Sequence, residues 1–298
     1  MARKTTSECQ EEWQLIHQFD DNGKPFKMAT GIAQCPNRDF VIVDPVEIRV
    51  GIFTAEGIFR INLNPDDDND QGKLFQPSDV AVTSDGLIVV VDKSPDVKVF
   101  KLDSGLFAYS FKTAGVDDSR SGTGDITTHV CPAAVRANRA TENTEYIYIL
   151  DILRKLITCH EKDGALVQSI PTGGAPYYLS VINSHRFLLS DYNHHKLRMI
   201  DTSSGIAKVI LVIDTPIDGL GRRANAVGAC VNDESILVAL GRRQGHCTIH
   251  RYSSVTGRFV GIVATKLTNP FNMVMTAEGK LAVADGGKVK IFERLSTR

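Results

Sequence analysis

Five apolar runs that each end in an aspartate recur along the chain, and this repeat constrains the fold more than any other feature. The runs are DFVIVD, LIVVVD, YIYILD, FLLSD and LAVAD, and a sixth run, ILVALG, ends at Gly241 without an acid. Their aspartates are Asp44, Asp92, Asp151, Asp191 and Asp285. A spacing of roughly 40 to 60 residues is typical of the blades of a β-propeller.

Each repeat continues with the same series of strands. An alternating run follows the aspartate, for example DVKVFKL or KLRMID, and such alternation predicts a half-buried strand. A turn with glycine and another apolar run come next, as in GLFAYSF from Gly105, because glycine adopts the positive φ that a hairpin requires. A further run, often begun by proline, precedes each aspartate-ended strand. Each repeat therefore predicts a meander of four strands, which is one propeller blade.

In the last repeat no fourth strand follows KVKIFE, whereas the segment WQLIHQF, residues 13–19, has the pattern of a fourth strand and no blade of its own. Pairing this segment with the last blade would close the ring and remove an unpaired sheet edge. We therefore predict an all-β fold, a six-bladed β-propeller of four-stranded antiparallel blades over residues 13–293. A flexible segment at 1–12 and a tail at 294–298 are expected outside it. Burial of Trp13, Leu15, Ile16 and Phe19 is expected to stabilise the closing strand.

Composition restricts the class of protein and its compartment. The 298 residues carry a net charge of -1, which is ordinary for a globular domain. No apolar run approaches the roughly 18–20 residues of a membrane helix, and the first residues lack the apolar core of a signal peptide. The six cysteines form no CxxC pair, so we expect reduced, mostly buried thiols. We predict a cytoplasmic protein that does not contact a membrane and is monomeric as an isolated domain.

Two adjacent histidines, His194 and His195, raise the question of a metal site in the fourth repeat. Zinc needs three or four convergent ligands, and no third ligand stands at a suitable spacing. We therefore interpret the pair as part of a polar turn and predict no bound metal. His160 and His250 lie in predicted third strands, and we expect them on the blade surface.

Catalysis in a propeller channel would require polar residues from the innermost strands of several blades. These strands are mostly small or apolar, and their carboxylate and amide residues, Asp79, Asn232 and Asn272, are not expected to share one register. No GxSxG, HExxH or phosphate loop occurs. The aspartates that end the apolar runs recur in every repeat but one, so we assign them a structural role, accepting N–H bonds in their own turns. The sequence predicts no enzyme activity and no cofactor.

The fourth repeat, D-Y-N-H-H-K-L-R-M-I-D, resembles the NHL repeat, which is named after an Asn-His-Leu stretch in this turn. The resemblance covers all six units and the closing strand, although the fifth unit lacks the aspartate and the first and third differ in the turn. It implies a propeller like the C-terminal NHL domain of tripartite-motif proteins. Several such domains bind single-stranded or hairpin RNA on a basic top face and repress mRNAs, and others bind proteins. The chain has no RING cysteines and no coiled-coil heptads, so any ubiquitin-ligase activity would lie elsewhere.

Charge is unevenly distributed over the face where the turns between second and third strands and the inter-blade connections emerge, here called the top face. The first two inter-blade connections are acidic, whereas the later blades carry basic residues with aromatic residues among them. A basic surface with exposed aromatic rings is typical of single-stranded nucleic-acid binding. The candidate RNA- or partner-binding residues are Arg154, Lys155, Tyr177, Tyr192, Asn193, His195, Lys196, Arg222, Arg223, Arg242, Arg243, Phe271 and Lys288.

Two functions stay open at this point. The first is a platform that recognises single-stranded or hairpin RNA in post-transcriptional regulation. The second is a protein-interaction propeller that recruits partners or substrates in ubiquitin signalling.

The RNA interpretation predicts the effect of the double change Arg242→Glu and Arg243→Glu. Affinity for a randomised single-stranded RNA pool should fall at low salt, because lost phosphate contacts weaken all sequences alike and reduce the salt slope by about one unit per contact. An unchanged affinity would favour the protein-binding alternative.

Overall fold

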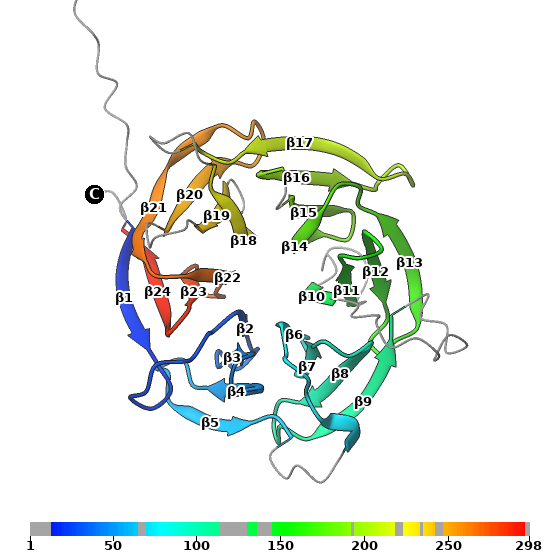
Figure 1. Cartoon of the computed structure of the whole chain (residues 1–298), viewed down its shortest axis with the longest axis vertical. Coiled ribbons are helices and arrows are strands. Elements are labelled where there is room, and N and C mark those ends of the chain that lie inside the picture. The colour runs from blue at the N-terminus through cyan, green and yellow to red at the C-terminus, as the bar shows by residue number, and fades with distance from the viewer. Residues whose placement is uncertain are drawn as a thin grey trace, which may run out of the picture.

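Six four-stranded antiparallel sheets surround a central channel as the blades of a β-propeller in the computed structural model (Figure 1). The structure describes residues 13–64, 70–113, 130–135, 145–191, 194–217, 223–232, 235–241 and 247–295; of residues 70 and 130–135 it describes the backbone alone. The predicted all-β class, the number of blades and the antiparallel order within each blade are confirmed.

Within each blade the strands follow one another from the channel to the outside of the ring. Blade 1 consists of β2 (Gly31–Gln34), β3 (Phe40–Asp44), β4 (Arg49–Phe53) and β5 (Phe59–Asn62). A short 3₁₀ helix, η1 (Asp70–Gly72), precedes blade 2, which consists of β6 (Asp79–Val82), β7 (Leu87–Val91), β8 (Asp96–Lys101) and β9 (Phe107–Lys112). Blade 3 consists of β10 (Val130–Val135), β11 (Tyr146–Asp151), β12 (Leu156–His160) and β13 (Leu166–Pro171).

The second half of the ring repeats this order. Blade 4 consists of β14 (Pro176–Asn183), β15 (Arg186–Asp191), β16 (Lys196–Asp201) and β17 (Lys208–Asp214). Blade 5 consists of β18 (Asn225–Val231), β19 (Ser235–Gly241), β20 (Cys247–Ser253) and β21 (Phe259–Leu267). Blade 6 consists of β22 (Pro270–Met275), β23 (Leu281–Asp285), β24 (Lys288–Arg294) and β1 (Trp13–Phe19).

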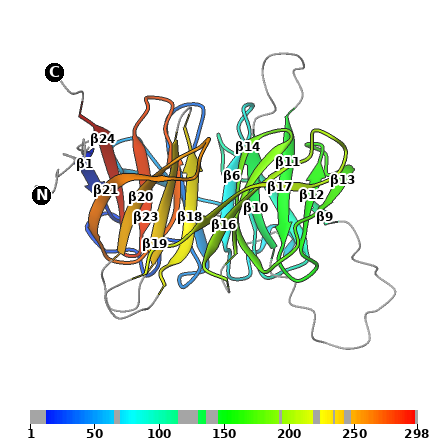
Figure 2. The same cartoon turned by 90° about the horizontal axis from the view of Figure 1, so that it is seen from above.

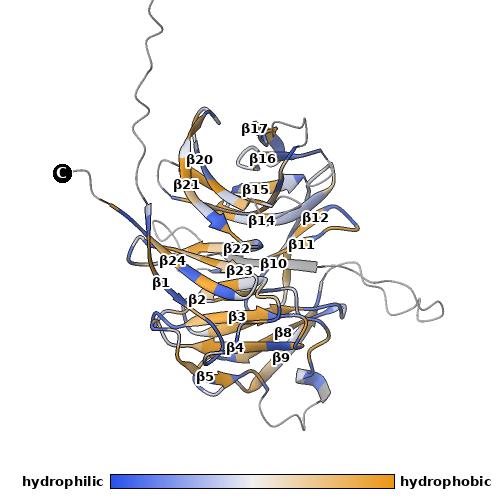
Figure 3. Ribbon diagram, turned by 60° about the vertical axis from the view of Figure 1, so that its left-hand side comes forward, coloured by the Kyte–Doolittle hydropathy of each residue, from blue (hydrophilic) through white to orange (hydrophobic). Residues whose placement is uncertain are grey.

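The core lies between neighbouring blades, because each sheet packs its two faces against the sheets beside it. The second strands are therefore buried along their whole length, as in β3 and β23, and apolar residues dominate β3 and β4 in Figure 3. One such cluster joins Val41 of blade 1 to Val80 and Phe100 of blade 2. The cysteines with described side chains, Cys35, Cys159, Cys230 and Cys247, are free and buried, as predicted. Among the described residues, no helix has the length and apolar character needed to cross a bilayer.

Strand ends gather at the two flat faces of the ring, and the side view shows the blades spanning the thickness between them (Figure 2). Because the strands alternate in direction, the turns between second and third strands share one face with the inter-blade connections. This is the top face defined from the sequence. The hairpins between first and second strands emerge on the opposite face.

The closing strand is confirmed, since β1 pairs with β24 from Trp13 opposite Arg294 to Phe19 opposite Val289. The last strand thus includes Arg294, one residue beyond the predicted boundary. The expected burial of Leu15 and Ile16 is wrong, because these side chains are 42% and 41% exposed. They lie on the outermost strand of the blade, which is exposed at positions on both of its faces.

Phe19 holds the closing strand to the adjacent blade. Its ring lies 6.2 Å from that of Phe40 and 5.9 Å from that of Phe53, both in blade 1. Gly57, with φ of 84°, makes this position possible, because a Cβ at Gly57 would lie only 2.2 Å from the Phe19 ring. One aromatic side chain therefore joins the end of blade 6 to the start of blade 1.

Replacing Phe19 by Ala should lower the free energy of unfolding by about 3 kcal/mol, because the change leaves a cavity in an aromatic cluster. Leu15→Ala on the same strand is the matched control and should cost less than about 1 kcal/mol, because Leu15 is half exposed. Urea denaturation of both variants measures the difference. Equal losses would contradict the role assigned to Phe19.

Candidate functional site

The top face brings together the described members of the set predicted from the sequence. Turn residues Arg154 and Lys155 lie between β11 and β12, and His195 and Lys196 occupy the corresponding place in blade 4. The other described members are Tyr177 at the start of β14, Arg223 before β18, Phe271 in β22 and Lys288 at the start of β24. Five predicted residues lie outside the described residues: Tyr192, Asn193, Arg222, Arg242 and Arg243.

Several of these cations are paired with acids of the chain itself. Arg154 forms an ion pair with Asp151 and donates a 3.1 Å hydrogen bond to Thr113 Oγ1. Arg223 donates to the Thr215 carbonyl at 3.0 Å and lies 3.7 Å from Asp214. Lys196 lies 3.8 Å from the same Asp214 carboxylate. These acids reduce the positive charge that the described part of the top face presents to a polyanion.

Two members of the set contribute to the top face through their backbone conformation and carbonyl groups. Lys155 and His195 have φ of 56° and 54°, and their carbonyls accept hydrogen bonds from the backbone N–H groups of Thr172 and Thr215 at 2.9 and 3.0 Å. Each bond ties the turn between second and third strands to the inter-blade connection that follows its blade. These residues thus shape the top face whatever their side chains bind.

The repeated aspartates of blades 1 to 3 perform the structural role that the sequence predicted, accepting N–H bonds in their own turns. Asp44 Oδ1 accepts from the N–H groups of Val46 and Glu47, and Asp151 Oδ1 accepts from those of Leu153 and Arg154. The carboxylates also reach the connection that precedes the blade: Phe75 N–H donates to Asp92 at 2.8 Å, and Thr268 and Asn269 donate to Asp285. Asp44 and Asp92 therefore each join a turn to an inter-blade connection.

Sequence reasoning missed a buried cation beside three of these aspartates. Lys98 Nζ lies 2.7 Å from Asp92 and Lys290 Nζ lies 2.6 Å from Asp285, while Arg198 lies 3.4 Å from Asp191. A signal was present, because the third strands VKV, LRM and VKI carry a basic residue at the same position. The pairing compensates the cost of burying a carboxylate.

The histidines form no metal site within the described residues, where no group of three potential ligands converges. His194 lies in the turn, and its Nδ1 is 2.7 Å from Asp191 Oδ1. The expectation that His160 and His250 lie on the blade surface is wrong, because they are only 0% and 8% exposed. Both lie in third strands, which a fourth strand and a neighbouring blade cover. Burial lowers the pKa of His160, whose ring packs 5.1 Å from that of Phe111.

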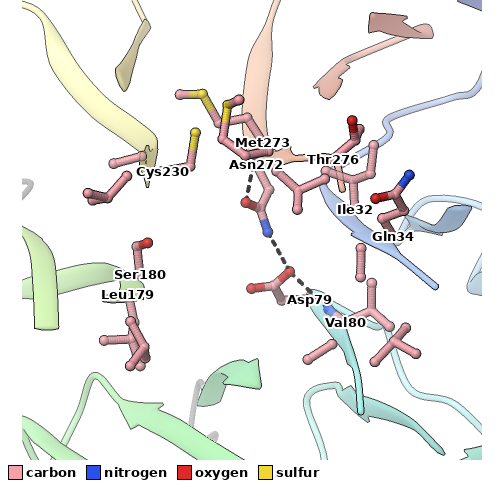
Figure 4. Close-up of a pocket in the computed structure, with 18 of the residues that line it drawn as sticks. Ile32, Gln34, Asp79, Val80, Leu179, Ser180, Cys230, Asn272, Met273 and Thr276 are labelled. Carbon is pink, nitrogen blue, oxygen red and sulfur yellow. Dashed lines mark hydrogen bonds between the residues drawn. The ribbon is translucent and has the colours of Figure 1, made fainter. Parts of the chain in front are cut away.

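A central cavity of about 610 Å³ runs between the innermost strands β2, β6, β14, β18 and β22. Most of the residues that line it are apolar, Ile32, Val80, Leu179 and Met273 among them, and Figure 4 shows these side chains around the open centre. The surface that the cavity presents is nevertheless about equally polar and apolar. Among the described residues that line the cavity, Asp79 is the only carboxylate.

Asp79, Asn272 and Tyr178 form a hydrogen-bonded chain at the top end of this cavity. Asn272 Nδ2 donates to Asp79 Oδ1 at 2.9 Å, and the Tyr178 hydroxyl donates to Asn272 Oδ1 at 2.5 Å (Figure 4). The expectation that the polar residues of the inner strands share no register is therefore wrong for Asp79 and Asn272. It holds for Asn232, which lies in the hairpin after β18 and bonds to Ser235.

Burial in the cavity wall raises the pKa of Asp79 to about 7, against smaller opposite effects of the bonds from Val80 and Asn272. The cause is the loss of hydration of the charged form. The close approach of blade 1 contributes to this burial, since a Cβ on Gly31 would lie 3.0 Å from Asp79 Oδ1.

A different kind of surface lies on the outer strands of blades 4 and 5, and we call it the outer rim. It consists of six apolar side chains that are between 37% and 49% exposed: Val209, Ile210 and Val212 of β17, and Phe259, Val260 and Ile262 of β21. Both strands are also the edges of their sheets. Exposed apolar side chains on an edge strand favour association with another chain.

The fold is similar to that of a solved structure, the WD40 β-propeller domain of Doa1. The TM-score is 0.59 at 11% sequence identity, and the similarity covers 96% of this chain and 98% of that one. At this identity the similarity shows the fold alone. No protein-family model matches the sequence, and no curated protein matches it. The NHL resemblance and the RNA binding that it implies stay predictions.

The two classes of buried aspartate should respond in opposite ways to replacement by Asn. The folded-state pKa of Asp79 is above its unfolded value, so the folded protein holds this proton more tightly, and the stability it contributes is lost as the pH rises through about 7. When the pH is raised from 5 to 8, the free energy of unfolding of Asp79→Asn should therefore rise by roughly 2–4 kcal/mol relative to that of the parent protein. Denaturant unfolding at both pH values checks the result.

Asp285→Asn is the matched comparison. This change leaves Lys290 without its buried partner and should cost about 3 kcal/mol at pH 8. If both variants lost stability alike at pH 8, the distinction between a paired and an unpaired buried aspartate would be refuted.

Proposed function

We propose that the chain is a non-catalytic protein-interaction platform that binds a partner through the outer rim of blades 4 and 5. The observation that carries this proposal is the exposure of six large apolar side chains on two neighbouring edge strands. Water contact with these side chains is unfavourable, and a protein surface removes it at about 25 cal/mol for each Å² of apolar area buried.

The unpaired edges of β17 and β21 add a second means of binding. Each edge presents N–H and C=O groups in strand geometry, so a partner strand would extend the blade by one strand. Apolar side chains on both strands would then select the partner by shape. A polynucleotide would leave this apolar surface exposed, because its affinity comes from phosphates and base stacking.

The top face supports the RNA alternative less well. Arg154, Lys196 and Arg223 each pair with an acid of the chain, so a phosphate would have to compete with Asp151 and Asp214. The acidic connections of the first two blades reduce the positive potential further. We therefore place protein binding first and treat RNA binding as an outcome that the experiment distinguishes.

The rim double variant Ile210→Lys with Ile262→Lys should abolish partner binding while leaving the fold intact, because both side chains are exposed. The immobilised parent and variant chains are compared by quantifying the proteins and RNA that each retains from a cell extract. A protein partner should be retained at least tenfold less by the rim variant, and melting curves of both chains should coincide.

Two control variants make the experiment decisive. Ile58→Lys with Leu106→Lys places the same change at side chains that are 62% and 45% exposed on blades 1 and 2, and it should retain the partner. Lys155→Glu with Lys288→Glu changes the top face instead. RNA retained by the parent and lost only from this top-face variant would replace the proposed function by RNA binding.

A further inference from the structure

One oxygen of the Asp79 carboxylate accepts two hydrogen bonds, and the other points into the open cavity. Oδ1 accepts from Val80 N–H and from Asn272 Nδ2, both at 2.9 Å. The other oxygen has no hydrogen-bond partner among the described residues, and Figure 4 shows it pointing into the cavity toward the wall formed by Leu179 and Ser180. It is the acceptor that the cavity offers to a ligand.

The orientation of this carboxylate is fixed by its neighbours. Asn272 Oδ1 accepts from Met273 N–H at 2.7 Å and from the Tyr178 hydroxyl at 2.5 Å. These two donors require that the amide nitrogen of Asn272 face Asp79, so that it holds Oδ1 in place. An acceptor that is oriented before a ligand arrives binds it with a smaller entropic cost.

The charge of Asp79 has no compensating cation among the described residues, unlike that of Asp92 and Asp285. Asp92 and Asp285 each have a lysine within 2.7 Å, whereas Asp79 has no cation within ion-pair distance among the described residues. The described groups that lie against it from β2, β7 and β22 are Gly31, Val91 and Asn272, and none of them is cationic. A buried carboxylate without a cation is unfavourable, so a ligand that supplies one is stabilised.

The chemistry of the site selects an ammonium over a guanidinium. A guanidinium binds a carboxylate best through both oxygens at once, but Oδ1 of Asp79 already accepts two N–H groups. An ammonium is a compact charge that needs one oxygen and further acceptors around it. The Ser180 hydroxyl faces the same space from the opposite wall (Figure 4).

We propose that the top end of the channel binds a lysine side chain of an extended segment of a partner protein, with the ammonium paired to Asp79. Asp79 is the first residue of β6, directly after the inter-blade connection, so the segment enters from the top face. This inference rests on the proposed function in that the lysine belongs to a partner protein, but it concerns a site separate from the outer rim.

Synthetic peptides test the site without a known partner. The probe is acetyl-Gly-Gly-Lys-Gly-Gly-amide, titrated into the purified chain at pH 8 and low salt and followed by calorimetry. The same peptide with Nε-acetyl-lysine, and one with arginine, should bind at least tenfold more weakly. Equal binding of the acetylated peptide would overturn the proposal.

Asp79→Asn should weaken the lysine peptide at least tenfold, because it removes the charge and keeps the shape. Glu278→Gln is the matched control. It also replaces a carboxylate by an amide, but on the opposite face of the ring, where Glu278 accepts from Gln34 Nε2. This variant should bind the peptide like the parent. Melting curves establish that both variants are folded. Unchanged affinity of the folded Asp79→Asn variant would refute the site.

The pH dependence provides a second measurement. Since burial raises the pKa of Asp79 to about 7, the parent should bind the peptide roughly tenfold more tightly at pH 8 than at pH 6, and Asp79→Asn should show no such change. A parent affinity that is the same at both values would contradict the assignment to Asp79.

Two further outcomes separate this site from the proposed function and from small ligands. The rim variant Ile210→Lys with Ile262→Lys should bind the peptide like the parent, so a failure of the rim proposal leaves the peptide result intact. Binding of butylammonium ion without binding of the lysine peptide would overturn the assignment to a protein segment.

Discussion

Antiparallel pairing of β1 with β24 joins the first described strand of the chain to the last, and every feature inside the ring depends on this closure. Blade 1 lies between blades 6 and 2 only when the ring is closed, and Phe19 packs against Phe40 and Phe53 at that junction. Asn272 of blade 6 donates a hydrogen bond to Asp79 of blade 2, which lies 193 residues away in the sequence. Gly31 of β2 lies against Asp79, where a Cβ would be 3.0 Å from its carboxylate. An open ring would separate Asn272 from Asp79 and abolish the polar end of the channel.

The buried carboxylates of this structure have two kinds of surroundings. The aspartates that end the second strands accept turn N–H groups in blades 1 to 3, and Asp92, Asp191 and Asp285 each lie beside a basic residue of the third strand. Asp79 has two N–H donors and no described cation, and its pKa is raised accordingly. The same residue type thus acts as a structural tie at the ends of the second strands, whereas in the channel Asp79 has no cation beside it among the described residues.

The surfaces of the ring differ in the ligand that they favour. Internal ion pairs involving Asp151 and Asp214 reduce the charge of the top face, whereas the outer strands of blades 4 and 5 expose apolar side chains along unpaired edges. In the proposed function a protein partner would bind the rim through apolar contact and strand pairing, and a lysine of such a partner would bind in the channel. Both proposals assign the molecule to recognition by shape and charge rather than to catalysis.

Local pattern alone determined the strands, the blades, the closing segment and the turn role of the repeated aspartates, because strand periodicity and turn chemistry act over a few residues. It also predicted the face on which the described candidate residues lie. Only the tertiary structure decided which side chains meet: it buried His160 and His250, exposed Leu15 and Ile16, and joined Asp79 to Asn272. These outcomes depend on how neighbouring blades cover one another and on where the ring closes. Such contacts arise between residues far apart in sequence, and no local period records them.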